Sequence, residues 1–290
     1  MIIVKLQGGM GNQMFQYALA KAFASMKQTS FELDVEFLLD RTPNKGADFV
    51  FRDYDLDIFT IYPMLSKKGI EQRYHKNSVY DYLYSGFKNK KIYKEPFFNF
   101  DSKVFELNGN VYLDGYWQSP LYFKSVEEEL RKDFTFKCAI EDCSTAVYEK
   151  IAASDSVCIN VRRADFVNNT FHGVCDMNYF NAAIEYVVAK LANPHLFVFS
   201  DDPAWCSDNF KASVPMDIIG HEHKGFKFGN YLQLMSKCSH FIIPNSTFGW
   251  WAVWLSNKKK CIVVAPQKWF MDTTINTDDL IPADWIRLGN

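Results

Sequence analysis

The sequence predicts an α/β protein with parallel sheets, and three observations support this. Short apolar runs alternate with longer segments of helical periodicity, most regularly between residues 150 and 265. The 290 residues are 48% hydrophobic, enough to bury one large core or two smaller ones. No internal repeat or low-complexity tract interrupts this alternation. Because crossover helices cover both faces of a parallel sheet, we expect the second half to form a Rossmann-like domain of about 140 residues.

The first half begins as a strand, a glycine-rich turn and a helix. Residues 2–6 form a short, mostly apolar run, and Gly8, Gly9 and Gly11 follow it. The next helix is predicted from apolar side chains at helical spacing, namely Phe15, Leu19, Ala22, Phe23 and Met26. The other expected elements are strands at 31–35 and 111–113 and a helix at 121–133. Residues 40–110 show no pattern from which an element can be assigned.

The second half is more regular, so its elements can be assigned in order. One helix is expected to be capped near Asp176, and Asp202-Pro203 starts another, since Pro is favoured at the first helical position. The expected strands are 157–161, 196–199, 216–219, 241–243 and 261–264, and further helices are expected at 230–237 and 247–255. A linker is expected between residues 136 and 154, which gives domains 1–145 and 146–290.

The composition excludes several classes of function. The net charge is -2, whereas a nucleic-acid-binding domain needs excess Lys and Arg to neutralise phosphates. The seven cysteines form no CxxC pair and no zinc-type cluster, so we expect a reduced, cytoplasmic chain without a metal. No stretch reaches the roughly 20 apolar residues of a membrane span, and we expect no signal peptide. The lysine run at 258–260 could touch an anionic membrane, but a solvated loop is the favoured interpretation.

Polar residues follow three of the strands expected in the second half. They are Arg162, Arg163 and Asp165 after the first strand, Asp201 and Asp202 after the second, and Asn245, Ser246 and Thr247 before the helix at 247–255. Because ligands of open parallel sheets bind at the carboxyl ends of the strands, we expect these groups to line one site. Arginine forks and a helix N-terminus both bind phosphate, which predicts a nucleoside diphosphate site. An Arg–Asp165 ion pair and simple helix capping are the competing interpretations.

The N-terminal glycine loop is ambiguous by itself. It follows a strand and opens a helix, as a dinucleotide-binding fingerprint does, and the acidic Asp34 lies about 20 residues further on. Met14 occupies the third glycine position, however, and is too bulky for the close packing that the fingerprint needs. Gly9 and Gly11 can still bring the backbone near a diphosphate or a sugar, and Asn12 adds an amide.

Taken together, these segments resemble the family-11 glycosyltransferases, the bacterial α-1,2-fucosyltransferases. The segments that carry the resemblance are 8–17, 115–119, 160–165, 199–202 and 245–252, in this order along the chain. The resemblance extends from residue 1 to about residue 270. It implies a GT-B fold, in which two Rossmann-like lobes face each other across a cleft.

The resemblance also implies a reaction and a site. The reaction is inverting transfer of L-fucose from GDP-fucose to the 2-hydroxyl of a galactose in a glycan, without a metal or a cofactor. Arg162 corresponds to the arginine that neutralises the β-phosphate. The implied donor-binding residues are Asn160, Arg162, Asp201, Asp202, Asn245, Ser246, Thr247, Phe248, Gly9 and Gly11. On the acceptor side, Trp117 and Gln118 are the candidates.

The residue that could accept a proton from the acceptor is open. The family motif usually begins with His where this chain has Asn160, and an amide cannot carry a proton. Asp165 is a candidate base, although an ion pair that orients Arg162 is the favoured interpretation. His172 is a weaker candidate, and Asn12 could contribute polar contacts to catalysis. A reaction in which the leaving group departs first would need little help from a base.

Three alternatives remain at this stage. The first is a transferase that uses another GDP-sugar, which only donor trials distinguish. The second is an NAD-dependent oxidoreductase, against which Met14 argues. The third is a non-catalytic carbohydrate-binding protein with a Trp- and Tyr-rich surface, in which the arginine pair would have no function.

Overall fold

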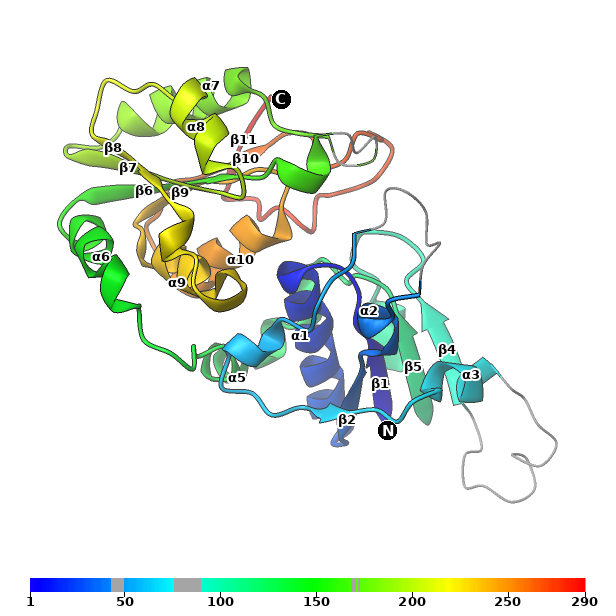
Figure 1. Cartoon of the computed structure of the whole chain (residues 1–290). Coiled ribbons are helices and arrows are strands. Elements are labelled where there is room, and N and C mark those ends of the chain that lie inside the picture. Colours follow the sequence, from blue (N-terminus) through cyan, green and yellow to red (C-terminus); the bar gives the residue numbers. More distant parts are fainter. Residues whose placement is uncertain (43–49, 76–89, 168–170, 172, 290) are drawn as a thin grey trace, which may run out of the picture. The chain divides into compact units, whose positions relative to one another are not determined.

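The computed structural model describes residues 1–42, 50–75, 90–167, 171 and 173–289 (Figure 1). The chain divides into two compact units. The first comprises Met1–Thr135 and Asn276–Leu280, and the second comprises Phe136–Ile275 and Ile281–Asn290. Each unit has its own sheet, and all the strand pairs found among the described residues are parallel. The expected α/β class with two Rossmann-like halves is confirmed.

The contacts place the division at residue 135, whereas the sequence analysis placed it at residue 145. The intervening segment belongs to the second unit because its side chains are bonded there. Ser144 Oγ lies 3.0 Å from His223 Nδ1 and accepts a hydrogen bond from Asn230 Nδ2 at 2.9 Å. In the opposite direction, Asn276–Leu280 returns to the first unit, where the carboxylate of Asp279 accepts a hydrogen bond from Phe100 N at 2.6 Å.

The first unit is a sheet with the strand order β3-β2-β1-β5-β4. Its strands are β1 (Ile2–Lys5), β2 (Phe31–Asp34), β3 (Met64–Leu65), β4 (Lys90–Lys94) and β5 (Asn110–Asp114), and its helices are α1 (Met10–Lys27), α2 (Glu36–Leu39), α3 (Ile70–His75) and α5 (Glu127–Asp133). The helix predicted at 121–133 is continuous only as α5. Two 3-10 turns precede it, because the Ser119 hydroxyl accepts a hydrogen bond from Leu121 N and starts a tighter turn.

The second unit is a sheet with the order β11-β10-β9-β6-β7-β8. Its strands are β6 (Asp155–Val161), β7 (Pro194–Ser200), β8 (Met216–Ile219), β9 (His240–Ile242), β10 (Val263–Pro266) and β11 (Ile286–Leu288), and its helices are α6 (Thr145–Ala152), α7 (Met177–Val188), α8 (Pro203–Asn209), α9 (Gly229–Lys237) and α10 (Thr247–Ser256). The predicted helix caps are confirmed: Asp176 accepts a hydrogen bond from Tyr179 N, and Asp202 accepts one from Trp205 N. The edge strand β11 was missed, because its residues are only half-buried.

The core of the second unit lies between β6 and α7. The buried side chains of Val157 and Ile159 pack with those of Tyr179 and Phe180. Burial of side chains this size contributes about 1.5–3 kcal/mol each. The Tyr179 hydroxyl donates a hydrogen bond to Ile243 O at 2.5 Å, which fixes the helix against the end of β9.

The strand orders define where ligands are expected. In each sheet the chain starts in the middle, adds strands towards one edge and then crosses to the other side. The crossing point lies between β1 and β5 in the first unit and between β6 and β9 in the second. Loops separate at such a point and leave a crevice at the carboxyl ends of the strands.

Candidate functional site

Arg162 lies directly after β6, beside the crossing point of the second unit. One guanidinium nitrogen is 2.9 Å from an Asp201 carboxylate oxygen, and another forms an ion pair with Asp165. The contact to Asp201 is close but lacks hydrogen-bond alignment, so it acts mainly through charge. The Arg162 side chain is 27% exposed. Two carboxylates therefore orient this cation while part of it stays accessible.

Arg163 has a different environment, because its side chain is directed towards α8. Its guanidinium carbon lies 3.7 Å from the centroid of the Trp205 ring, and its Nε lies 3.6 Å from an Asp202 oxygen. Its backbone N–H donates to Asp201 at 2.9 Å. Cation–π stacking on Trp205 gives this residue a structural role. Asp202 is likewise engaged, since it caps α8.

Asn160 is buried at the end of β6, at 6% exposure. Its Nδ2 donates to Phe199 O at 3.3 Å, and its Oδ1 has no hydrogen-bond partner among the described residues. A Cβ placed on Gly249 would lie 2.8 Å from that oxygen. The glycine in the first turn of α10 is therefore what lets the helix approach this amide.

The helix α10 opens directly after β9 and its connecting residues. Ser246 is the N-cap and makes no side-chain capping bond, which removes simple capping as the explanation for its hydroxyl. Thr247 and Phe248 form the half-buried first turn. Asn245 is 3% exposed, and its Nδ2 donates to Trp269 O at 3.1 Å, so it ties two loops together.

These predicted residues share one edge of the second sheet. The strands β9, β6 and β7 are neighbours, and an ion pair links Arg162 to Asp201 across two of them. A fixed guanidinium near a helix N-terminus is an arrangement that stabilises phosphate. Three of the residues predicted to bind the donor, Arg162, Ser246 and Thr247, thus follow neighbouring strands at this edge. Their roles in donor binding remain predictions.

His221 extends this edge to β8 and was missed by the sequence analysis. Its Nε2 lies 3.2 Å from Ser200 O, and its ring packs edge-on against Phe228. The loop that follows is strained, since Lys227 and Phe228 both have positive φ without being glycine. Such strain is often found at binding sites. A lone loop histidine gives no sequence signal. His172, the weaker base candidate, lies outside the described residues.

In the first unit, the glycine loop follows β1 at the crossing point. Gly8 has φ +78, and a Cβ there would lie 2.3 Å from Asn12 Nδ2, so this position requires glycine. Gly9 has no such requirement, since an added Cβ would meet nothing within 4 Å. Gly11 is buried in the first turn of α1. The two glycines expected to bind the donor therefore belong to the first unit.

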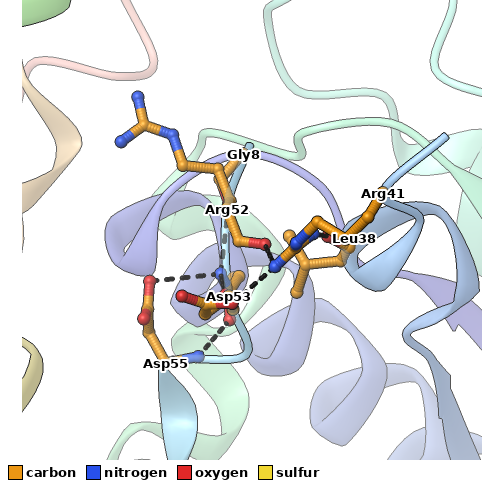
Figure 2. A network of polar contacts seen from close by, with 7 residues as sticks. Gly8, Leu38, Arg41, Arg52, Asp53 and Asp55 are labelled. Carbon is orange, nitrogen blue, oxygen red and sulfur yellow. Dashed lines mark hydrogen bonds and ion pairs between the residues drawn. The ribbon is translucent and has the colours of Figure 1, made fainter. Parts of the chain in front are cut away.

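A polar network ties residues 52–55 to this glycine loop (Figure 2). Gln13 Nε2 donates to Gly8 O at 3.1 Å and to Asp53 O at 2.9 Å, and Gln13 Oε1 accepts from Asp55 N at 2.9 Å. Arg41 adds hydrogen bonds at 2.8 Å to the carbonyl oxygens of Leu38 and Arg52. Residues 52–55 are thus held against the glycine loop by side-chain hydrogen bonds from Gln13 and Arg41.

The loop after β5 lies on the other side of the same crossing point. Gln118 Nε2 donates to Asn12 Oδ1 at 2.9 Å, which connects the two loops. Trp117 is fully buried with φ +57, an uncommon backbone conformation for a bulky residue. Trp117 Nε1 and Gln118 Oε1 have no hydrogen-bond partner among the described residues. Buried polar groups are rarely left unpaired, so these two atoms favour a ligand or water at this loop.

Glu95 completes this edge and was also missed. It follows β4, in the region without an interpretable pattern, and its two carboxylate oxygens accept hydrogen bonds from Tyr116 N at 2.6 Å and Trp117 N at 2.9 Å. Burial raises the pKa of Glu95 to about 7, and the charge of Asp114 adds to this, although the two hydrogen bonds lower it.

Asp34 does not supply the exposed acid of a dinucleotide site. It is 3% exposed, and its carboxylate accepts hydrogen bonds from the Tyr112 hydroxyl and Glu36 N at 2.8 and 2.9 Å. Burial raises its pKa. A ribose hydroxyl therefore has no access to this carboxylate, which argues against the NAD interpretation.

Among the described residues, no group of three or more His, Cys, Asp or Glu side chains is placed to hold a metal ion. No helix in this part of the chain has the length and hydrophobicity to span a membrane. The lysines at 258–260 are exposed after α10.

The whole sequence matches one family profile. Glycosyl transferase family 11 aligns with residues 1–289. The chain belongs to this family. Two relatives from Escherichia coli cover 98–99% of both sequences: an alpha-1,2-colitosyltransferase at 31% identity and the O-antigen biosynthesis glycosyltransferase WbnK at 30%. The rat galactoside alpha-(1,2)-fucosyltransferase 2 is 26% identical over 88% of this chain and 67% of its own.

Solved structures agree on the fold. The FUT1 structure from Arabidopsis thaliana, in complex with GDP, aligns over 92% of this chain and 71% of its own with a TM-score of 0.54 and 12% identity. The NodZ alpha-1,6-fucosyltransferase crystallised with GDP aligns over 91% and 94%, with a TM-score of 0.50 and 14% identity. The expected family and GT-B fold are confirmed, and the chain is a glycosyltransferase.

Proposed function

We propose that this glycosyltransferase transfers L-fucose from GDP-fucose to the 2-hydroxyl of a galactose in a glycan, with inversion and without a metal or cofactor. The observation that carries the proposal is Arg162, a part-exposed guanidinium fixed by two carboxylates at the crossing point of the second sheet. The names of the relatives support the sugar class, since they include colitosyl- and fucosyltransferases that form α-1,2 linkages.

Arg162 and the start of α10 would act on the leaving group. As the bond from the anomeric carbon to the diphosphate breaks, negative charge grows on the departing oxygen. A cation and a helix N-terminus held in place beforehand stabilise that charge more in the transition state than in the ground state. This accounts for a reaction that needs no metal to neutralise the diphosphate.

The first unit would bind the acceptor. Its crossing point carries the Asn12–Gln118 amide pair, beside a Lys5–Asp114 ion pair at the ends of β1 and β5. Amides both donate to and accept from sugar hydroxyls, whereas the buried Trp117 ring would support the turn that carries Gln118.

Asp165 is better explained as a positioning residue than as the base. Its carboxylate forms an ion pair with Arg162, which would have to break before it could take a proton from the acceptor. Neither Asn160 nor Asn12 can act as a base, because an amide has no basic nitrogen at neutral pH. Loss of the leaving group ahead of attack by the acceptor fits this set of residues.

A second donor, GDP-colitose, is favoured by one observation. The E. coli alpha-1,2-colitosyltransferase is 31% identical to this chain over 99% of its length. Colitose is L-fucose without its 3-hydroxyl, so both donors present the same nucleotide and the same 6-methyl group. A site that hydrogen-bonds the 3-hydroxyl would strongly prefer fucose, whereas an apolar site would discriminate by only about 10–200-fold.

One experiment tests the reaction and the donor together. The protein is incubated with lactose, EDTA and either GDP-fucose or GDP-colitose, and products are identified by mass and linkage. An α-linked sugar on the galactose 2-hydroxyl, formed at the higher kcat/KM from GDP-fucose, supports the proposal. Faster transfer from GDP-colitose would replace fucose as the donor. Product formation that EDTA abolishes would contradict a metal-independent mechanism.

A further inference from the structure

The turn that carries Trp117 and Gln118 contains an ionisable clamp. Both carboxylate oxygens of Glu95 accept hydrogen bonds from this turn, one from Tyr116 N at 2.6 Å and the other from Trp117 N at 2.9 Å. The Glu95 side chain also lies tightly against Gly115, where an added Cβ would come within 2.4 Å of Glu95 Cβ. The carboxylate thus holds two successive peptide groups of the loop.

The turn needs this clamp because its conformation is unfavourable by itself. Trp117 has φ +57, which a bulky residue adopts only when its surroundings enforce it. The same turn aims Gln118 Nε2 at Asn12 Oδ1. A carboxylate accepts two N–H groups at once through two charged oxygens, whereas a carboxylic acid offers one neutral carbonyl oxygen and a hydroxyl oxygen that accepts only weakly. Protonation therefore leaves one of the two N–H groups with a poor acceptor and loosens the strained turn.

We propose that Glu95 is a positioning residue whose carboxylate form holds the Tyr116–Trp117 turn ready for the acceptor, and that its protonation releases the turn and weakens acceptor binding. This inference rests on the proposed function, because it takes the first unit as the acceptor side. It adds a pH response that belongs to the acceptor and leaves the donor unaffected.

The groups around Glu95 place this titration near neutrality. Burial raises the pKa of Glu95 to about 7, and the neighbouring Asp114 carboxylate adds to the shift. Asp114 is itself paired with Lys5 at 3.5 Å, which limits its effect. The hydroxyls of Tyr116 and Tyr122 also face this region, and burial raises the pKa of both, so they stay neutral across the relevant range.

The test is the KM for lactose and for the donor, measured between pH 5.5 and 8.5. In the wild type, the lactose KM is expected to rise about tenfold as pH falls through 7, the effect of one lost hydrogen bond to a charged group. The donor KM should not follow this curve. Glu95→Gln mimics the protonated state, so its lactose KM should be high and independent of pH. Glu129→Gln, a charge removal at an exposed position of α5, should behave like wild type.

Fluorescence gives a second readout that does not require turnover. Trp117 is the only tryptophan within residues 1–135 and 276–280, so the difference between wild type and Trp117→Phe reports on the turn. The difference signal should titrate near pH 7 and should lose this titration in the Glu95→Gln background. A flat lactose KM in the wild type, or a titration that survives Glu95→Gln, would overturn the inference. If the wild type transfers no sugar at all, the proposed function fails, and the fluorescence titration still decides the clamp.

Discussion

The carboxyl edges of the two sheets are built from different chemistry. In the second unit, two carboxylates hold Arg162, and the Trp205 ring and one carboxylate hold Arg163. This edge therefore consists of cations fixed by neighbouring anions. In the first unit, the crossing point carries the Asn12–Gln118 amide pair and a buried indole, beside one Lys5–Asp114 ion pair. Its nearby carboxylate, Glu95, is bonded to backbone N–H groups instead of to a cation.

This difference shows how one topology serves two kinds of ligand. A diphosphate carries charge that only fixed cations and helix ends can offset, and those cations need carboxylates to hold them in place. A neutral sugar offers hydroxyls, which amides match in both hydrogen-bonding directions. The following substitutions test whether each edge depends on the chemistry assigned to it.

The largest effect is expected from Arg162→Ala. Loss of the cation beside the leaving diphosphate should lower kcat by about 10²–10³-fold, the typical cost of one preorganised electrostatic group. The neighbouring Arg163→Ala is the matched control, because its guanidinium packs on Trp205. Arg163→Ala should lower the thermal midpoint of unfolding but leave kcat close to the wild-type value. Equal losses of kcat in both variants would remove the distinction between the two arginines. Steady-state kinetics and thermal unfolding measure the two effects.

Glu95→Gln should uncouple stability from pH in the first unit. The pKa of Glu95 is raised by burial from 4.5 to about 7, so the folded state binds a proton that the unfolded state has released. Its contribution to stability is fully present below pH 4.5 and is lost as pH rises through 7, an effect of up to about 3 kcal/mol.

The measurement is urea unfolding at pH 5 and pH 8 for both proteins. The wild type should lose more free energy of unfolding than Glu95→Gln over this interval. The variant should therefore be relatively more stable at pH 8 while binding lactose less well. Parallel losses in the two proteins would mean that Glu95 does not titrate in the folded state within this range.

Two glycines at helix starts provide a comparison of packing between the units. Gly249→Ala would place a Cβ 2.8 Å from Asn160 Oδ1 and 3.2 Å from Ile243 Cβ. The overlap should cost about 1–3 kcal/mol, more than the roughly 1 kcal/mol that Ala gains over Gly in a helix. Gly9→Ala meets nothing within 4 Å and should cost less than about 1 kcal/mol. Chemical unfolding of both variants measures the difference, and equal costs would show that the contact at Asn160 relaxes freely.

The sequence predicted the second unit well because its signals are local. Strand runs, the Asp176 and Asp202 caps and the polar residues after β6, β7 and β9 can each be recognised within a few residues. The strand order then places the polar residues on one edge. By contrast, Glu95 accepts hydrogen bonds from backbone N–H groups about 20 residues away, and no local sequence pattern predicts such a contact.

The helix predicted at 121–133 is α-helical only from residue 127, and the reason is local. Its periodicity is helical, but the Ser119 hydroxyl bonds Leu121 N and starts a 3-10 turn instead. The second unit begins at residue 136, at the start of the expected linker, because bonds from Ser144 to His223 and Asn230 tie that segment to it. The bonds of Ser144 span about 80 residues of sequence, and such bonds cannot be read from composition or periodicity.

The loss of kcat/KM in Asp165→Asn decides between two roles for this carboxylate. As a positioning residue, Asp165 contributes one charge-assisted hydrogen bond to Arg162, and its loss should lower kcat/KM about tenfold. As the base, it would account for about 10²–10⁴-fold, and the acidic limb of the pH–rate profile would vanish with it. We expect the smaller loss and an unchanged limb, because Asp201 still holds the guanidinium from the other side. A thousandfold loss with a flattened limb would instead make Asp165 the proton acceptor and move the chemistry of the acceptor hydroxyl to the arginine edge.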